Sequence, residues 1–559
     1  MAASHSCIWK FIRVNRYRPA PAGRPQTEHH RFLRTACLLL AVSVPATTHT
    51  HGFGERYDLP VPLWLYLTGA AAAVVLSFVV LAVFFRRPSP LLSYPRFNLL
   101  AFRFGRALAH PWVVGSCRIL AVGVFGLILF AGLFGAQNPF KNIAPLMVWA
   151  IWWVGMAYVS ALAGNLWALI NPFDALWVWA EAAYSRLRHG ARLSMDVRCP
   201  DWLGVWPAVA LFITFVWMEL IWDRSEVPAS LAAAIIAYAA VTWTGMLAFG
   251  REPWLRHGEV FALVFTLLSR FAPTEVRVNE VRVCAACGSE RCRARRNDCV
   301  NCHDCFRRAD GAARQWNIRP YAVGLLADQP ARLSETVLVV LILSTVTFDG
   351  FIETPVWAAI SNQLAGVLTA ATLGAVSSPL SPDTHARIHT LGLIAFPAVF
   401  FAIYLLFCRI IGVCAGTAQT TGQRTLSTLQ IACLFAPTLI PIAIAYQLAH
   451  YLSLLLMATQ YLIPLASDPF GFGWDLFGTA TYFVRIGVVD ARFIWMTSVT
   501  AIIVGHVAAV YLAHIMSMRA FGNQRAALRS QYPMLVLMVC YTMVSLWIMA
   551  QPIVRSRFG

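Results

Sequence analysis

Charged side chains are scarce in this sequence. Asp, Glu, Lys and Arg make up 13% of its 559 residues, and 58% are hydrophobic, whereas about a quarter of the residues in soluble domains are charged. The composition therefore excludes a soluble globular domain and indicates a membrane protein with many spans. The formal charge of +18 does not indicate a nucleic-acid partner, because the Lys and Arg residues lie in short loops between apolar runs, a pattern that reports membrane topology.

Common catalytic motifs are also missing. The sequence contains no H-E-x-x-H, G-x-S-x-G or Walker A motif, and no G-x-G-x-x-G between a strand and a helix. These absences exclude the usual sequence signatures of zinc proteases, serine hydrolases and nucleotide-binding proteins. No repeat of solenoid period is visible either.

Six of the fourteen cysteines lie in one short polar stretch with the spacing C-x2-C-x4-C-x6-C-x2-C-x2-C. They are Cys284, Cys287, Cys292, Cys299, Cys302 and Cys305. Two cysteines at C-x2-C spacing can reach one ion from a single turn, and a second pair completes a tetrahedral shell. We predict a metal site, with zinc as the first choice and an iron–sulfur cluster as the alternative. Disulfide bonds and free thiols remain alternatives to a metal site. If a metal is bound, we prefer a structural role, in which it stabilises the fold, to a catalytic one.

The cysteine stretch divides the sequence into segments. Residues 1–46 form a basic extension that ends in a signal-like segment. Residues 47–272 form a first membrane half, 273–332 the Cys-rich loop, and 333–559 a second membrane half. We expect an all-α polytopic membrane protein with about ten transmembrane helices of about 20 residues each. The expected spans lie near residues 62–85, 117–136, 145–170, 203–222, 229–249, 333–351, 389–413, 428–459, 492–515 and 531–551.

Arginines orient these spans. Arginine-rich loops follow the first, third and ninth spans, and residues 277–332 contain eleven arginines. Positive loops stay in the cytoplasm and thiolates persist in reducing compartments, so we place the Cys-rich loop in the cytoplasm. The apolar run Val260–Phe271 is short; if it crossed the membrane, the Cys-rich loop would lie outside. Pro437, Pro441 and Pro464 predict a kinked or broken helix.

Ionisable residues inside or beside spans are candidates for function. On the expected outer side we single out His51, Asp349, His450 and Asp468, with His506 nearer the middle of its span. Histidine and carboxylate side chains can hold a hydrolytic metal, so a divalent metal at an outer site is one interpretation. The alternatives are interhelical hydrogen bonds for the histidines and solvated or loop-forming carboxylates.

Five stretches of the sequence resemble the bacterial membrane-bound fenitrothion hydrolase family, and the likeness covers most of the chain from His51 onward. They are residues 51–69, 344–351, 435–451, 462–470 and 505–514. The resemblance implies hydrolysis of organophosphorus triesters to a nitrophenol and a dialkyl thiophosphate. It also implies a multi-pass protein of the bacterial inner membrane, in a complex that can include a second homologous subunit. It carries over no catalytic residues.

A small apolar triester partitions into the lipid bilayer and can reach an outer site from there. Hydrolysis needs an activated water in line with the aryl leaving group and an electrophile on the phosphoryl oxygen or sulfur. Our hypothesis builds this site from His51, Asp349, His450, His506 and Asp468. The rival interpretation is a transporter or membrane redox protein that uses the broken helix and the cysteine loop. A scaffold subunit for a homologous catalytic chain is the third.

Overall fold

The computed structural model describes residues 61–84, 94–287, 292, 299–326, 330–372, 382–416, 426–485, 490–521 and 523–551. The chain divides into two compact units, 1–58 and 59–559, and all the described residues belong to the second. The signal-like segment 1–46 and the candidate residue His51 lie outside the described residues. The account below concerns the second unit by itself.

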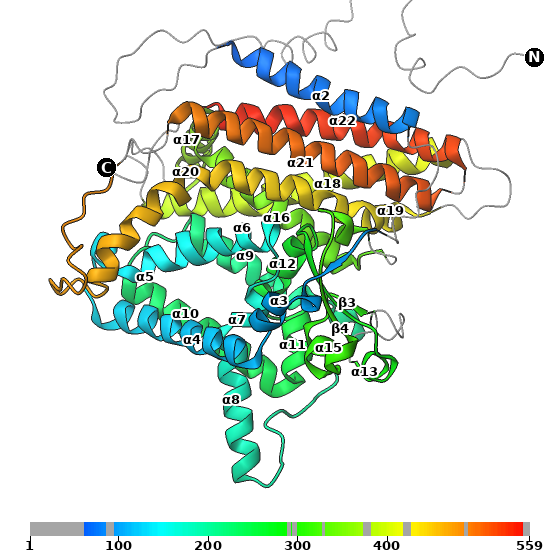
Figure 1. Cartoon of the computed structure of the whole chain (residues 1–559). Coiled ribbons are helices and arrows are strands. Elements are labelled where there is room, and N and C mark those ends of the chain that lie inside the picture. Colours follow the sequence, from blue (N-terminus) through cyan, green and yellow to red (C-terminus); the bar gives the residue numbers. More distant parts are fainter. Residues whose placement is uncertain are drawn as a thin grey trace, which may run out of the picture. The chain divides into compact units, whose positions relative to one another are not determined.

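Within the described residues, ten helices are long and apolar enough to cross a membrane. A helix such as α2, with 22 residues, rises about 33 Å, which matches the hydrocarbon thickness of a bilayer. The prediction of an all-α polytopic membrane protein with about ten spans is confirmed. The spans, shown in Figure 1, are α2 (Leu63–Phe84), α4 (Pro111–Phe134), Ile143–Leu162, Asp201–Leu220, α10 (Pro228–Phe249), α16 (Leu333–Ile352), α18 (Pro382–Gly416), Thr428–Ser467, α21 (Ala491–Ala520) and α22 (Gln524–Met549).

Three of these spans are composite. Residues 143–162 run from α5 (Ile143–Pro145) through a π-helix, η4 (Leu146–Val154), into α6 (Gly155–Leu162). Residues 201–220 combine η5 (Asp201–Leu203) with α9 (Trp206–Leu220). Residues 428–467 comprise α19 (Thr428–Phe435), a 3-10 turn, η8 (Ala436–Leu439), and α20 (Ile440–Ser467).

The predicted break in the long apolar run lies at η8. Pro437 stands in this 3-10 turn and Pro441 in the first turn of α20, where its missing N–H removes no hydrogen bond from the helix. Pro464 is accommodated inside α20.

Helices of the two sequence halves pack together. The first span, α2, contacts α21 and α22, and α20 contacts both α16 and the π-helix η4. Close approach of α20 and α21 requires Gly505, because a Cβ there would lie 2.3 Å from the Cβ of Ala445. In Figure 1 the ribbons of α2, α21 and α22 run alongside one another. The two membrane halves are therefore separate in the sequence only, because their helices share one hydrophobic core.

The short apolar run forms α12 (Val260–Ser269), which follows α11 (Arg251–His257). Ten residues of helix rise about 15 Å, half the thickness of a hydrocarbon core. Val260, Phe261, Val264 and Phe265 are almost completely buried, and α12 packs against α6 and α9. Its length favours a helix that enters the bundle without crossing it.

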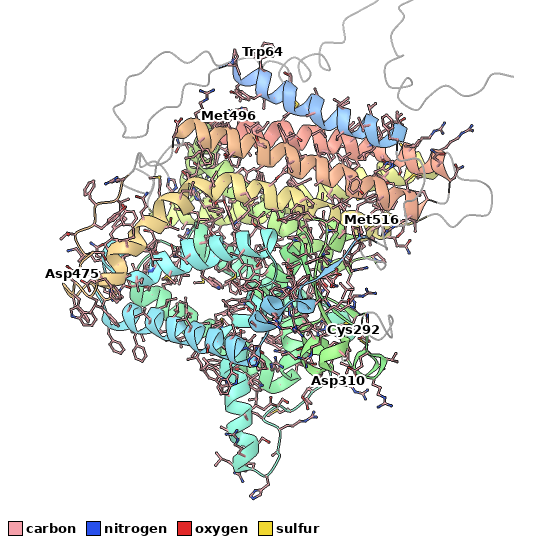
Figure 2. All side chains as sticks on the ribbon, viewed as in Figure 1. Trp64, Cys292, Asp310, Asp475, Met496 and Met516 are labelled. Atoms are coloured by element: carbon pink, nitrogen blue, oxygen red, sulfur yellow. The ribbon has the colours of Figure 1, made fainter. Side chains whose placement is uncertain are left out.

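A small antiparallel sheet, which sequence analysis missed, combines three strands of the Cys-rich segment with one from residues 97–98. Its strands are β1 (Phe97–Asn98), β2 (Thr274–Val278), β3 (Cys299–Val300) and β4 (Arg314–Ile318), in the order β1-β4-β2-β3. Val278 pairs with Cys299, and Thr274 pairs with Ile318. In Figure 2, Asp475 and Met496 lie toward one end of the long helices, and Met516 and Cys292 lie toward the other.

Candidate functional site

Local structure turns the six cysteines toward one another. Cys284 lies in α13 (Val281–Ala285), with Cys287 in the turn that follows. Cys299 begins β3, and Cys302 precedes α15 (His303–Arg308), whose first turn contains Cys305. Residues three apart lie on the same face of a helix turn, so Cys302 and Cys305 present their sulfurs together. The β2–β3 pairing then brings Cys299 beside them.

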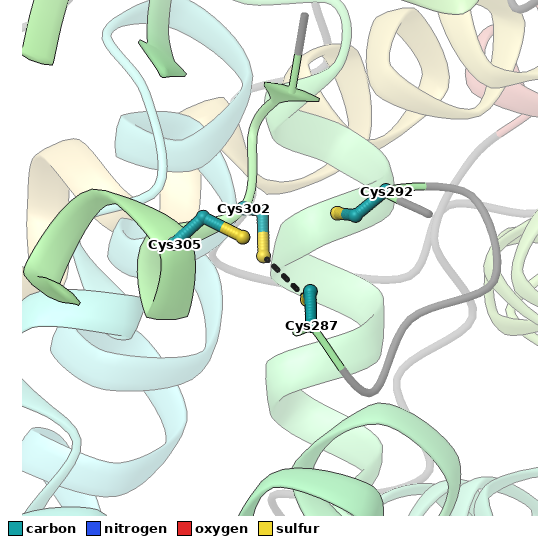
Figure 3. A group of neighbouring side chains, drawn as sticks. All are labelled: Cys287, Cys292, Cys302 and Cys305. Atoms are coloured by element: carbon teal, nitrogen blue, oxygen red, sulfur yellow. Dashed lines mark hydrogen bonds between the residues drawn. The ribbon is translucent and has the colours of Figure 1, made fainter. Parts of the chain in front are cut away.

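The sulfur atoms form two overlapping groups. Those of Cys287, Cys292, Cys302 and Cys305 all lie within 4.8 Å of one another, and Figure 3 shows these four side chains converging. A second group contains Cys284, Cys299 and Cys305. The predicted metal-binding cluster is confirmed as a set of close cysteines that could hold a metal. Within the part of the chain that the structure describes, these are the groups with three or more suitable ligands.

Arg256 joins this cluster to the membrane helices. It lies on α11, and its Nη2 donates to Asp304 of α15 at 2.9 Å and to the Cys287 sulfur at 3.6 Å. Hydrogen bonds from the Cys292 and Cys299 thiols, together with a smaller effect of the Arg256 charge, lower the pKa of Cys302. The thiolate is the form of cysteine that binds metals, and these surroundings favour it at Cys302; neighbouring thiols and burial raise the pKa values of Cys292, Cys299 and Cys305.

A buried carboxylate anchors the sheet beside the cysteines. Glu275 of β2 accepts hydrogen bonds from Arg319 at 2.8 Å, Arg96 at 2.6 Å and Tyr94 at 2.7 Å. The side chains of Glu275 and Arg319 are completely buried. Burial alone would raise the pKa of Glu275, but the Tyr94 hydrogen bond and the Arg319 and Arg96 charges outweigh it and lower this pKa. These contacts tie residues 94–98 to the Cys-rich segment.

A second polar site lies inside the helix bundle. Asp349 is near the end of α16, and His450 and Tyr451 are in the middle of α20. His450 Nε2 lies 3.0 Å from Asp349 Oδ2, and the Tyr451 hydroxyl donates to the same oxygen. The structure therefore brings together two of the proposed catalytic residues. Tyr451 was not predicted, although it adjoins His450 in the sequence.

A small cavity adjoins this pair. Its volume is about 30 Å³, and Asp349, Tyr451, Glu219 and Gln447 contribute its polar lining. One water needs about 10–15 Å³ on this measure, so the space holds about two waters. Drug-sized ligands occupy pockets of about 300 Å³ or more. Glu219 was missed by sequence analysis, although an acidic residue inside an apolar span was itself a signal.

The remaining candidates lie elsewhere. Asp468 follows α20, 18 residues from His450, which corresponds to about 27 Å of helix. Its carboxylate accepts from the backbone N–H groups of Phe472 at 2.9 Å and Gly473 at 2.6 Å. The structure therefore separates Asp468 from the His450 site and gives it a role in forming the loop. His51 lies outside the described residues.

His506 is buried on α21, away from the lining of the cavity. Its Nδ1 bonds the Ile502 carbonyl at 2.8 Å, and its ring lies 5.7 Å from that of Tyr541, measured between centroids. The Tyr541 hydroxyl bonds Thr347, two residues before Asp349. In the contacts described, His506 is therefore connected to the region of Asp349 through Tyr541 and Thr347 and does not touch Asp349 itself.

The candidate site of the bundle consists of Asp349, His450, Tyr451, Glu219 and Gln447. Among the described residues, Asp349 and His450 belong to no group of three or more His, Cys, Asp or Glu side chains that could hold a metal, so the outer metal site stays a prediction. Comparisons of this chain with protein-family models, curated proteins and solved structures find no match.

Proposed function

We propose that this chain is a hydrolase of the bacterial inner membrane that cleaves small apolar organophosphorus triesters such as fenitrothion. The observation that carries the proposal is the hydrogen bond between His450 and Asp349, whose carboxylate lines a cavity with room for water. A histidine oriented by a carboxylate is a common general base. The likeness of residues 344–351 and 435–451 to fenitrothion hydrolases supports the same conclusion.

In the proposed reaction, Asp349 accepts a hydrogen bond from His450 Nε2, which leaves Nδ1 to take a proton from water. The activated water attacks phosphorus in line with the aryl oxygen. The P–O(aryl) bond breaks, the nitrophenolate leaves, and a dialkyl thiophosphate forms. Tyr451 donates to Asp349 and so stabilises the charged carboxylate. Because the cavity has space only for water, α9, α16 and α20 must separate to admit the ester.

For the cysteine centre we propose zinc in a folding role. A zinc ion with Zn–S bonds of 2.3 Å in a tetrahedron needs sulfurs about 3.8 Å apart. The Cys287 and Cys302 sulfurs lie 3.9 Å apart. An iron–sulfur cluster inserts its own iron and sulfide between the thiolates and holds them further apart. Closed four-coordinate cysteine sites are structural, so this ion would stabilise the Cys-rich segment and leave hydrolysis to the bundle.

The test is nitrophenol release from fenitrothion by membranes that contain this chain, compared with membranes from cells with the empty vector. In H₂¹⁸O, one ¹⁸O should enter the dialkyl thiophosphate, because water attacks phosphorus. His450→Gln should lower the rate about 10²- to 10⁴-fold, the usual contribution of a general base. Tyr461→Phe, a change at an exposed tyrosine of the same helix, should keep the rate. Equal rates for His450→Gln and the unchanged chain would refute the assignment.

Proton or cation transport is the second candidate, and the composition of the cavity favours it. Glu219 and Asp349 lie inside spans and line the cavity, and intramembrane ionisable residues that face a water-sized space are typical of ion pathways. The adjoining π-helix and broken helix are further features of such sites. Acidification of proteoliposomes, followed with a pH-sensitive dye and abolished by Asp349→Asn, would favour transport; dye signals equal to those of empty liposomes would exclude proton transport.

A further inference from the structure

We propose that the six cysteines bind two zinc ions bridged by thiolates, rather than one. The inference rests on the zinc binding proposed above and is independent of hydrolysis. Its starting observation is that Cys305 belongs to both groups of converging sulfurs, the one with Cys287, Cys292 and Cys302 and the one with Cys284 and Cys299. A sulfur that lies between two groups of ligands is placed to bridge two ions.

Ligand number supports the second ion. Two tetrahedral zinc ions need eight ligand positions. Six thiolates fill eight positions when two of them bridge, because a bridging sulfur is counted once by each ion. Cys305 supplies one bridge. Cys292 supplies the other, because it belongs to the first group and its sulfur lies 3.1 Å from that of Cys299 in the second.

Burial points the same way, and charge does not oppose it. Cys284 and Cys299 are the two cysteines that a single ion held by the first group would not use, and their exposed fractions are 0% and 1%. Six thiolates around two Zn²⁺ ions carry a net charge of −2, which is no more than one Zn²⁺ ion with four thiolates and two neutral thiols would carry. Arg256, 3.6 Å from the Cys287 sulfur, partly offsets this charge.

The β2–β3 pair positions two cysteines of the second group. Cys299 opposes Val278 in the β2–β3 pair, and Cys284 lies 3.9 Å, sulfur to oxygen, from the Val278 carbonyl. Both cysteines are therefore fixed against the end of β2, while Cys305 reaches them from α15. A second ion would tie β2, β3, α13 and α15 together at one point, which the first group alone does not do.

The experiment measures metal content in the purified full-length chain, by mass spectrometry of the metals against quantitative amino-acid analysis. We expect two zinc ions per chain. Cys284→Ser and Cys299→Ser should each lower the content to one zinc ion per chain. Cys305→Ser removes a ligand of both ions and should lower the content below one. Cys199→Ser, a change at a half-buried cysteine outside the cluster, should retain two. One zinc ion in the unchanged chain, with the same content in Cys284→Ser, would overturn the second site.

A measurement on the unchanged chain avoids the risk that a variant fails to fold. After replacement of zinc by ¹¹³Cd, two ¹¹³Cd resonances in the chemical-shift range of thiolate ligands are expected, each from a four-sulfur site. A single resonance would refute the two-ion cluster and would agree with the single structural zinc ion proposed above. No bound zinc or cadmium, or iron with strong visible absorption, would refute both.

Discussion

The buried Glu275–Arg319 pair gives the sharpest test of how the Cys-rich segment is held together. Glu275→Ala removes the carboxylate that accepts from Arg319, Arg96 and Tyr94. The Arg319 side chain is completely buried, so its charge would lose a partner that solvent cannot replace. Breaking a buried pair in this way costs about 3–5 kcal/mol. Since each 1.4 kcal/mol is a factor of ten, local opening of the sheet should become roughly a hundred-fold to several thousand-fold more frequent.

Hydrogen exchange measured by mass spectrometry reports this opening directly. Protection of amides in β2 and β4 should fall by the stated factor in Glu275→Ala. Protection within α21 and α22 should not change, because those helices pack elsewhere. Glu226→Ala, a change at an exposed carboxylate, is the control and should cost less than about 0.5 kcal/mol. A loss of protection below tenfold at β2 in Glu275→Ala would show that the pair does not hold the sheet.

The same pair makes the sheet sensitive to acid. The pKa of Glu275 is lower in the folded chain than its ordinary value of 4.5. Its stabilisation is therefore complete above pH 4.5 and is lost as the pH falls through the lower, folded value. Exchange corrected for its intrinsic pH dependence should show this loss in the unchanged chain. Glu275→Gln, which cannot ionise, should be less protected at neutral pH and lack this acid transition; identical pH profiles for the two chains would refute the assignment.

Three other predictions concern the bundle and the metal. Tyr451→Phe removes a hydrogen bond to the Asp349 carboxylate, worth about 1.5–3 kcal/mol, so fenitrothion hydrolysis should slow by about ten- to a hundred-fold; an unchanged rate would contradict this role. Gly505→Ala places a Cβ 2.3 Å from that of Ala445 and should destabilise α20–α21 packing by about 1–3 kcal/mol. Thermal unfolding in detergent measures it, with Gly123→Ala, where nothing lies within 4 Å of the new Cβ, as the unaffected control. Removal of metal by a chelator should abolish the hydrogen-exchange protection of amides in β3 and α15 while leaving those of the spans protected. Protection of β3 and α15 that survives complete metal removal would exclude a structural role for the metal.

Features set by local composition were predicted from the sequence. Apolar runs of about 20 residues predicted the ten spans, because helix rise and bilayer thickness together fix the necessary length. Pro437 predicted the interruption before α20, since proline has no N–H to continue a helix. The density of cysteines at metal-ligand spacing predicted that they would form a cluster, but the pairing within it was not predicted, because Cys284 and Cys287 lie in different groups of sulfurs.

The polar site was only partly accessible to sequence reasoning. Asp349 and His450 were identified because ionisable residues are costly in a membrane. Their hydrogen bond, and the participation of Glu219, depend on which faces of α9, α16 and α20 meet. Asp468 shows the converse: it belongs to one of the stretches that support the family resemblance, yet its carboxylate organises a loop about 27 Å along the helix from His450.

The sequence by itself determined the number of membrane helices, the position of the break in the eighth span and the presence of a cysteine cluster. Only the tertiary structure decided that residues 97–98 join a sheet with residues 314–318, that Glu275 is paired with Arg319, and that Cys305 is shared by two groups of sulfurs. The physical reason is that a helix apolar on all sides does not indicate which face meets a neighbour. Contacts between residues in different elements of the chain are set by packing, which no local spacing encodes.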